Sequence, residues 1–523
     1  MEDRNRATPP ARIILETGKK RVPVNRKILG HFVEHLGRCI EDGIWMYGET
    51  SMPLLGEAPL ERVPVPLIDA LSPLRIPILR WPGGCFADTY HWKDGVGPRE
   101  TRPVRKNKAW GGIKNYKYTL GPDERNHFGT DEFLALCEKL DCDALINVNY
   151  GSGTPEEAAS WVARARSKSN RANIWGIANE IWGFHETGFE KKPDDYATRY
   201  LEFATAMRAA NPAIKLMAVG WIGHPGWNRA LLRAIRGHVD YLSIHLYFGN
   251  KPGLPFLLGT RPLPTTEAFY NMELNSAVAF DRLIEQTIED IDAIYGKDDP
   301  ARCKIAFDEW NVWSTMAQVY RADAPYYRLV EGIWSALVLD TFIRHADSVG
   351  MANYAQLVNA IGLVLAYEDT IVLTPQYHVM KMYGDALQAL ALPCTIECQD
   401  SISSKKYSKD FPAAISPAVD ATATISMEGK HVSIFIVNKH LAGRTEITIT
   451  TDGGQTMEID GKPRATILMH DDPFTCNTRK APDRIILKPW RGLSLDAGTV
   501  LVDMPPHAVA AVQLTLKEAA GAT

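Results

Sequence analysis

The chain has 523 residues, which is too long for one ordinary compact core, so we expect a large domain and a smaller second domain. Its 45% hydrophobic and 23% charged content is that of a globular protein. The formal charge of −4, from 58 basic and 62 acidic residues, gives no electrostatic basis for binding nucleic acid or an anionic membrane, and favours a neutral ligand.

The N-terminal residues 1–12 read MEDRNRATPPAR and lack the apolar core of a secretory signal. No later stretch is long and apolar enough to predict a transmembrane helix. These two features predict a cytoplasmic protein. The eight cysteines are scattered and several lie inside apolar segments, which favours buried thiols over a disulfide framework.

Between residues 26 and 384, short β-rich runs alternate with stretches that carry apolar residues at helical spacing, such as Thr154–Ser167 and Leu329–His345. Eight strands that alternate with helices are typical of an α/β fold of the (β/α)8 TIM barrel type. The predicted barrel strands are Lys27–Phe32, Ile76–Arg80, Ala144–Asn149, Ile174–Asn179, Lys215–Val219, Tyr241–Leu246, Lys304–Asp308 and Ser348–Tyr354.

From residue 385 to residue 523 the pattern changes to short alternating strands separated by Gly, Asp and Pro, which predicts an antiparallel β-sandwich domain. Residues 10–25 are also strand-like, and we expect them to join this sandwich. The predicted sandwich strands are Thr422–Met427, His431–Asn438, Arg444–Thr450, Arg464–Met469, Arg484–Leu487, Thr499–Met504 and Ala508–Thr515.

Residues 31–35 (HFVEH) have the H-x-x-E-H spacing of an inverted zinc-peptidase motif. That chemistry needs both histidines on one face of a helix, whereas residues 28–32 look like a strand that enters a loop. We therefore expect no zinc at this motif, and a packed or hydrogen-bonded role for His31.

Two glutamates each end a short apolar run and precede a tryptophan. Glu180 follows residues 173–179 and precedes Trp182, and Glu309 follows residues 303–308 and precedes Trp310. If they end the fourth and seventh barrel strands, both carboxylates face one cleft at the C-terminal end of the barrel. Two carboxyl groups in an aromatic-rich cleft indicate glycosidic bond cleavage, with one as acid and the other as nucleophile or base.

Other predicted strand ends bring polar side chains to the same face. A nucleophilic Glu309 must be ionised, and Arg80 and Tyr247 are candidate hydrogen-bond donors to it. Asn179 is placed to bond a sugar hydroxyl. Further side chains expected at the cleft are Glu34, His35, His245 and Gln356, with Trp81, Trp92, Trp110, Trp182 and Trp313 as its aromatic flanks.

Eight motifs follow one another along nearly the whole chain. They are residues 32–38 (FVEHLGR), 80–88 (RWPGGCFAD), 94–99 (DGVGPR), 126–130 (NHFGT), 179–180 (NE), 307–313 (FDEWNVW), 351–359 (MANYAQLVN) and 373–375 (LTP). In this order they resemble the α-L-arabinofuranosidases of glycoside hydrolase family 51. Such a series is more specific than any single motif.

The resemblance implies a retaining hydrolase with a (β/α)8 barrel, a C-terminal β-sandwich and no metal or cofactor, which releases terminal arabinofuranose from arabinan, arabinoxylan or their oligosaccharides. By position, Glu180 is the acid/base and Glu309 the nucleophile. The family's sugar-binding positions match Glu34, Asn179, Tyr247 and Gln356, and its sugar-contacting loop contains Cys85. Such proteins are commonly cytoplasmic and often hexameric, so we expect a homo-oligomer, specifically a hexamer.

Three segments depart from the family pattern. Ala178 stands where Gly is more usual, and residues 184–192 lack the Cys-Gly-Gly run of many relatives. The loop of residues 111–125 is longer than usual, and its Tyr116 and Tyr118 are candidates for extra cleft wall. These departures affect the expected specificity for the leaving group and do not change the expected chemistry.

The prediction is an exo-acting α-L-arabinofuranosidase that works by double displacement, with its two carboxyl groups about 5–5.5 Å apart. One alternative is an endo-acting glucanase or xylanase on the same barrel, which needs an open groove. The other is a carbohydrate-binding protein whose carboxylates do not catalyse.

Overall fold

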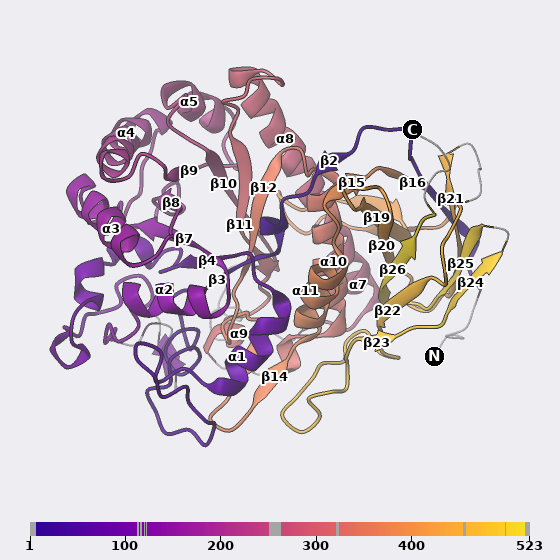
Figure 1. Cartoon of the computed structure of the whole chain (residues 1–523), viewed down its shortest axis with the longest axis horizontal. Coiled ribbons are helices and arrows are strands. Elements are labelled where there is room, and N and C mark those ends of the chain that lie inside the picture. Colours follow the sequence, from indigo (N-terminus) through magenta and orange to yellow (C-terminus); the bar gives the residue numbers. More distant parts are fainter. Residues whose placement is uncertain are drawn as a thin grey trace.

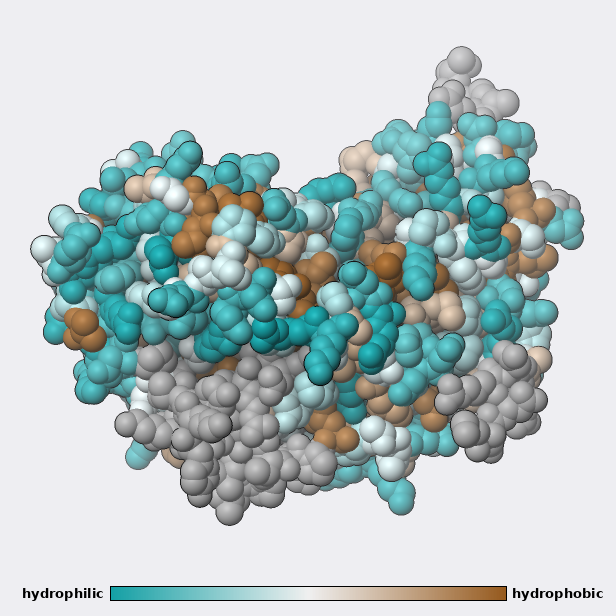
Figure 2. Space-filling view, turned by 90° about the horizontal axis from the view of Figure 1, so that it is seen from below, coloured by the Kyte–Doolittle hydropathy of each residue, from teal (hydrophilic) through white to brown (hydrophobic). Residues whose placement is uncertain are grey.

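The computed structural model describes residues 7–111, 114–115, 118–119, 121, 123–249, 263–320, 324–452, 457–496 and 498–517. In these ranges no helix is long and apolar enough to cross a lipid bilayer. Figure 2 shows a mostly hydrophilic face on which apolar residues form separate patches. Scattered apolar patches of this kind are ordinary on protein surfaces.

Eight parallel strands close into a barrel in chain order, which confirms the predicted TIM-barrel fold (Figure 1). Each is followed by at least one helix, as the alternating pattern predicts. The strands are β3 (Gly30–Phe32), β4 (Ile78–Trp81), β7 (Asp143–Val148), β8 (Ile174–Ile177), β9 (Lys215–Val219), β10 (Tyr241–Phe248), β11 (Lys304–Val312) and β12 (Val349–Ala355).

Two barrel strands differ from their predicted bounds by three or more residues at one end. The predicted strand Lys27–Phe32 is a short 3₁₀ helix over Arg26–Leu29 and a strand only from Gly30, because the Asn25 side chain accepts a hydrogen bond from the Lys27 N–H and starts a turn. Strand β11 does not end at Asp308 but runs to Val312.

The helices around the barrel start where the sequence carries capping residues. Helix α3 has Thr154 as its N-cap, whose hydroxyl accepts from the Glu157 N–H at 3.2 Å, and Pro155 at its first position. The helices that follow the eight strands are α1 (Val65–Leu71), α2 (Thr130–Lys139), α3 (Pro155–Lys168), α4 (Pro193–Ala210), α5 (Trp227–Ala234), α7 (Glu267–Asn275) with α8 (Val278–Tyr295), α9 (Ala317–Tyr320) with α10 (Leu329–Arg344), and α11 (Pro375–Ala386).

The inside of the barrel is apolar at its N-terminal end. A separate buried cluster takes one side chain from each of seven strands: Ile78, Leu145, Ile174, Met217, Tyr241, Ala306 and Met351. Most of these residues lie near the starts of their strands, so they close the bottom of the barrel. Polar side chains are left for the opposite end, where the strands finish.

Most of the remaining strands form two sheets that face each other across a second apolar core, to the right of the barrel in Figure 1. One sheet is β16 (Cys394–Cys398), β1 (Ala11–Leu15), β21 (Thr445–Thr451), β25 (Thr499–Met504) and β24 (Leu493–Asp496). The other is β2 (Val22–Pro23), β15 (Leu390–Leu392), β19 (Val419–Ile425), β20 (His431–Asn438), β26 (Ala508–Thr515), β22 (Arg464–Leu468) and β23 (Lys488–Pro489).

This sandwich is antiparallel apart from one pair, since β1 runs parallel to β21. The predicted strand Arg484–Leu487 is wrong. The side chain of Asn477 bonds both the N–H and the carbonyl of Ile485, each at 2.8 Å, and so takes the place of a neighbouring strand. The division of the chain into residues 26–384 and 385–523 stays a prediction.

Helices α10 and α11 lie between the barrel and the sandwich (Figure 1). Almost all of α10 is buried, and the carboxylate of Asp340 on it accepts from Tyr383 of α11 and Thr422 of β19. The Tyr383 ring also stacks on Phe435 of β20, with ring centres 4.0 Å apart. The two units are therefore joined by a packed interface and not by a loose linker.

A hairpin of β17 (Ser401–Ser404) and β18 (Ala414–Pro417), which the sequence pattern does not reveal, extends from this side toward the top of the barrel. The Asn275 side chain of α7 donates to the Ile402 carbonyl and accepts from Ser416. At the tip of the hairpin, Tyr407 packs against Phe248, the last residue of β10.

Candidate active site

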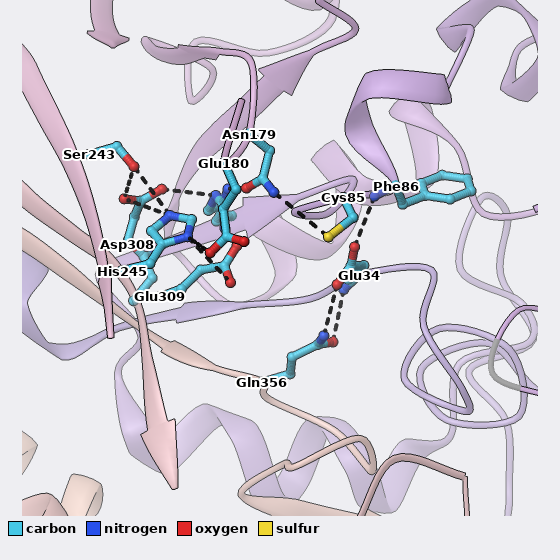
Figure 3. A network of polar contacts seen from close by, with 12 residues as sticks. Glu34, Cys85, Phe86, Asn179, Glu180, Ser243, His245, Asp308, Glu309 and Gln356 are labelled. Carbon is cyan, nitrogen blue, oxygen red and sulfur yellow. Dashed lines mark hydrogen bonds and ion pairs between the residues drawn. The ribbon is translucent and has the colours of Figure 1, made fainter. Parts of the chain in front are cut away.

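The two glutamates predicted from the sequence do face each other at the C-terminal end of the barrel. One carboxylate oxygen of Glu180 and one of Glu309 lie within 4.8 Å of each other, with His245 beside both (Figure 3). Glu180 follows β8, where the backbone turns through two positive φ angles, +81° at Ala178 and +39° at Glu180. Glu309 lies within β11, where a register shift sets it beside His245 of β10.

Glu309 accepts hydrogen bonds from Arg80 and Tyr247, the two candidate donors named from the sequence. Arg80 Nη1 donates to one of its carboxylate oxygens at 2.5 Å, and the Tyr247 hydroxyl donates to the other at 2.7 Å. The side chain of Glu309 is 8% exposed, so these charge-assisted bonds act with little competition from water.

Arg80 is buried and bonds three groups at once. Besides Glu309, it donates to the Asn179 side-chain oxygen at 2.8 Å and lies 3.2 Å from a carboxylate oxygen of Asp308. Burial alone raises the pKa of Asp308, but Arg80 and His245 outweigh it and hold this pKa below its ordinary value. Asp308 is not identified as a site residue in the sequence analysis. Successive side chains on a strand point to opposite faces, so a residue next to Glu309 is expected to point away from it, into the core.

His245 connects both candidate catalytic carboxylates (Figure 3). Its Nδ1 is 2.8 Å from Glu180 Oε1 and 3.6 Å from Glu309 Oε2, and its Nε2 is 3.4 Å from Asp308 Oδ1. Burial disfavours the charged ring, but Glu309 and Asp308 outweigh burial and raise the pKa of His245 to about 10. The ring is therefore an imidazolium at neutral pH, with both nitrogens as donors.

Glu34 and Gln356 form a reciprocal pair across the cleft from Glu180 (Figure 3). The Glu34 N–H donates to Gln356 Oε1 at 3.1 Å, and Gln356 Nε2 donates to Glu34 Oε2 at 3.2 Å. Glu34 Oε1 accepts from the Phe86 N–H and from the Trp110 ring nitrogen. Burial and the charge of Glu309 raise the pKa of Glu34 to about 8.

The Gly83–Gly84 pair after β4 lies directly against these side chains. A Cβ on Gly84 would come within 2.6 Å of Glu309 Oε1, and one on Gly83 within 2.7 Å of the Glu34 side chain. The motif RWPGGC therefore has glycine where the loop closely approaches two carboxylates. The same loop carries Cys85, whose sulfur is 3.9 Å from Asn179 Nδ2.

A cleft of about 650 Å³ opens above this network. Of the predicted site residues it is lined by Glu34, Cys85, Trp110, Glu180, His245, Tyr247, Glu309, Trp313 and Gln356. Arg80 and Asn179 do not line it; both are 1% exposed and act on the lining through hydrogen bonds. Trp81 and Trp92, expected at its flanks, are buried in the core instead.

The outer wall of the cleft contains Trp182, named from the sequence as a flank, and also Trp221, Lys409 and Asp410, which no local sequence signal predicts. Trp182 and Trp221 stack face to face at the rim, with ring centres 5.7 Å apart. Lys409 and Asp410, at the tip of the β17–β18 hairpin, line the opposite wall. Tyr116 lies outside the described residues and so does the Tyr118 side chain, so the proposed extra wall from that loop is not placed.

The H-x-x-E-H segment is not a helix. His31 lies on β3, where burial lowers its pKa to about 3. His35 lies beyond the strand, and its Nδ1 is 2.6 Å from a Glu124 carboxylate oxygen. The two histidines therefore cannot bind one ion as a helical pair does.

Comparisons with known proteins agree with this geometry. Residues 70–165 match the model of the α-L-arabinofuranosidase 1 domain, and residues 308–508 that of the α-L-arabinofuranosidase C-terminal domain. An intracellular exo-α-L-arabinofuranosidase of Bacteroides ovatus is 30% identical over 95% of this chain and 94% of its own length. The chain belongs to the α-L-arabinofuranosidases of glycoside hydrolase family 51.

Solved structures of this family have the same architecture. The family 51 arabinofuranosidase of Xanthomonas axonopodis pv. citri is 28% identical and superposes with a TM-score of 0.81, over 97% of this chain and 100% of its own. The α-L-arabinofuranosidase of Thermotoga maritima, solved as an arabinose complex, gives the same TM-score, identity and coverage. The barrel and sandwich of this chain are therefore those of the arabinofuranosidase family.

Proposed function

We propose that the chain is a retaining, exo-acting α-L-arabinofuranosidase, with Glu309 as nucleophile and Glu180 as acid/base. The observation that carries the proposal is the closeness of the two carboxylates. One oxygen of each carboxylate lies within 4.8 Å of the other, which supports the roughly 5–5.5 Å carboxyl separation of retaining enzymes over the about 6.5–9.5 Å of inverting ones.

In the first step, a Glu309 oxygen attacks the anomeric carbon while Glu180 gives its proton to the leaving glycosidic oxygen. The C–O bond to the leaving group breaks, and an ester to Glu309 forms. Arg80 and Tyr247 hold the Glu309 carboxylate in one orientation, which reduces the entropy cost of the attack.

In the second step, Glu180 acts as base. It takes a proton from a water molecule, whose oxygen attacks the anomeric carbon and releases Glu309 as a carboxylate. His245, which bonds Glu180 and faces Glu309, is a positioning residue that keeps the two carboxylates together despite their like charge.

We assign the arabinofuranosyl ring to the inner part of the cleft, against Glu34, Gln356 and Cys85. These side chains offer donors and acceptors to sugar hydroxyls, and Trp110 and Trp313 provide apolar faces nearby. The leaving chain then extends past Glu180 toward Trp182 and Trp221. The substrates proposed are arabinan, arabinoxylan and their oligosaccharides.

We also propose a cytoplasmic location, which is supported by the name of the Bacteroides ovatus relative, an intracellular enzyme. A homo-oligomer, specifically a hexamer, is the proposed assembly. Light scattering of the purified chain tests it, and a monomer at micromolar concentration would overturn it.

Three aryl glycosides, an α-L-arabinofuranoside, a β-xyloside and a β-glucoside, test the activity. We expect turnover of the arabinofuranoside alone, with NMR showing the α-configured product first. A β-configured first product would refute retention, and a preference for the glucoside or xyloside would favour the endo-acting alternative. Glu309→Gln and Glu180→Gln should each lower turnover by at least about 100-fold. Parent activity in both variants would refute the assigned roles.

A further inference from the structure

Beside the two candidate catalytic glutamates, three side chains of a different kind converge at the cleft. They are Cys85, from the loop after β4, and His185 and Glu186, from the loop after β8. The Cys85 sulfur, a ring nitrogen of His185 and a Glu186 carboxylate oxygen all lie within 4.8 Å of one another. His185 and Glu186 belong to the segment 184–192 that departs from the family pattern.

Glu186 is the unusual member of this group. Its side chain is 2% exposed, yet its Oε1 forms no hydrogen bond within the described part of the chain. The His185 ring forms an ion pair with that oxygen at 3.3 Å. A buried carboxylate oxygen without a hydrogen bond is costly unless a cation binds it.

The surrounding charge is negative. Asp88 lies close enough to Glu186 for the two charges to interact, and Glu180 acts on both Glu186 and Cys85. The buried cations described in this region are already engaged, Arg80 by Glu309, Asn179 and Asp308, and His245 by Glu180 and Asp308. A divalent cation at Cys85 and Glu186 would offset this excess of negative charge.

We infer that Cys85, His185 and Glu186 form a binding site for a zinc-class divalent cation at the edge of the cleft. Zinc binds thiolate, imidazole and carboxylate at about 2.0–2.3 Å, which puts neighbouring ligand atoms roughly 3.3–3.6 Å apart in a tetrahedron. The measured 3.3 Å between His185 and Glu186 already has this value. The thiol and imidazole select zinc over Mg²⁺ or Ca²⁺, which prefer oxygen ligands.

Three protein ligands leave a fourth coordination position, which faces the cleft. When the ion binds, Cys85 loses its proton to solvent and becomes the thiolate ligand. Because Cys85 also lines the proposed sugar site, an ion there competes with the sugar, so we expect hydrolysis to fall as the site fills. This consequence rests on the proposed function, whereas metal binding itself does not.

Among the residues that the structure describes, two other groups of candidate ligands need to be distinguished from this one. Asp281, Glu285 and His345 lie together elsewhere on the protein, and Glu180, His245 and Glu309 form the catalytic cluster. Neither group contains a thiol. Cobalt(II) is therefore the informative probe, because a thiolate ligand adds an intense near-ultraviolet charge-transfer band that the other two clusters cannot give.

The test is a Co²⁺ titration of the metal-stripped full chain, followed by Zn²⁺ competition. His185→Ala and Glu186→Gln remove one ligand each, and His91→Ala is the matched control, an exposed histidine that pairs with Glu157. We expect one equivalent of Co²⁺ with the thiolate band in the parent and in His91→Ala. Affinity should fall by about 100-fold or more in His185→Ala and at least about 10-fold in Glu186→Gln.

Absence of the thiolate band in the parent, or equal affinity in His91→Ala and both ligand variants, would overturn the site. Circular dichroism checks folding, and Glu186→Gln decides the matter if His185→Ala does not fold. A parallel assay measures hydrolysis of the aryl arabinofuranoside with rising Zn²⁺. If zinc binds without slowing hydrolysis, the competition between zinc and sugar is refuted. If the protein hydrolyses no arabinofuranoside at all, the proposed function is refuted, but the Co²⁺ titration still tests the metal site.

Discussion

The left-handed backbone at Ala178 gives a sharp prediction for Ala178→Gly. Its φ of +81° costs an alanine about 1–2 kcal/mol, which glycine does not pay. Two terms oppose this gain: glycine makes the unfolded chain more flexible, at about 0.4–1 kcal/mol, and the buried methyl group contributes about 0.8 kcal/mol. The terms nearly cancel, so we expect a change in unfolding free energy within about 0.5 kcal/mol of zero.

Ala218→Gly is the matched control. Ala218 is fully buried on barrel strand β9 and is not among the residues with positive φ. Its replacement carries the same two costs without relief of strain, so it should destabilise the protein by about 1.5 kcal/mol. Urea unfolding followed by tryptophan fluorescence measures the unfolding free energy of both variants. The signal reports on the barrel, because twelve of the thirteen tryptophans lie in residues 26–384. Equal destabilisation by the two substitutions would refute the strain at Ala178.

Three further predictions concern the cleft. Gly84→Ala should lower kcat/KM on an aryl arabinofuranoside more than about 100-fold while circular dichroism stays unchanged, since its Cβ would lie 2.6 Å from Glu309; activity within a few-fold of the parent would contradict this close approach. Tyr247→Phe removes the 2.7 Å hydrogen bond to Glu309. A loss of about 1.5–3 kcal/mol in transition-state stabilisation should lower kcat/KM roughly 10- to 150-fold. An unchanged kcat/KM would exclude a role for this bond. Glu34→Gln should flatten the pH dependence of stability. The folded pKa of Glu34, about 8, is above the unfolded value near 4.5, so its contribution is complete below pH 4.5 and is lost as the pH rises to 8, by on the order of 5 kcal/mol. Urea unfolding from pH 5 to 8 checks this, and parallel curves for parent and variant would contradict it.

The barrel could be predicted because its strands and helices have distinct hydrophobic periods, and parallel strands buried on both sides read as continuous apolar runs. The two catalytic candidates followed from the apolar runs and tryptophans beside them and from strand order, and their separate roles from the family resemblance. Errors arose where side chains compete with the backbone pattern. Asn25 turns residues 26–29 into a 3₁₀ helix, and Asn477 satisfies the backbone of Ile485, so a strand-like run pairs with no strand.

The rest of the site depends on contacts between residues far apart in the sequence. Asp308 is a neighbour of Glu309 in the chain, but its importance comes from Arg80 and His245, on two other strands. His185 and Glu186 had no motif to mark them, and Lys409 and Asp410 reach the cleft from a hairpin more than 90 residues beyond Glu309. Composition and periodicity carry no information on such long-range contacts.

The β17–β18 hairpin also affects how this protein can be truncated or redesigned. Because Lys409 and Asp410 at its tip line the cleft, the part of the chain that follows the barrel supplies a piece of the cleft wall. A barrel produced without residues 385–523 would lose a side of its own binding site together with the cover over α10. Conversely, exchanging residues 405–413 between relatives offers a way to retune which sugar chains are accepted without touching any residue of the barrel.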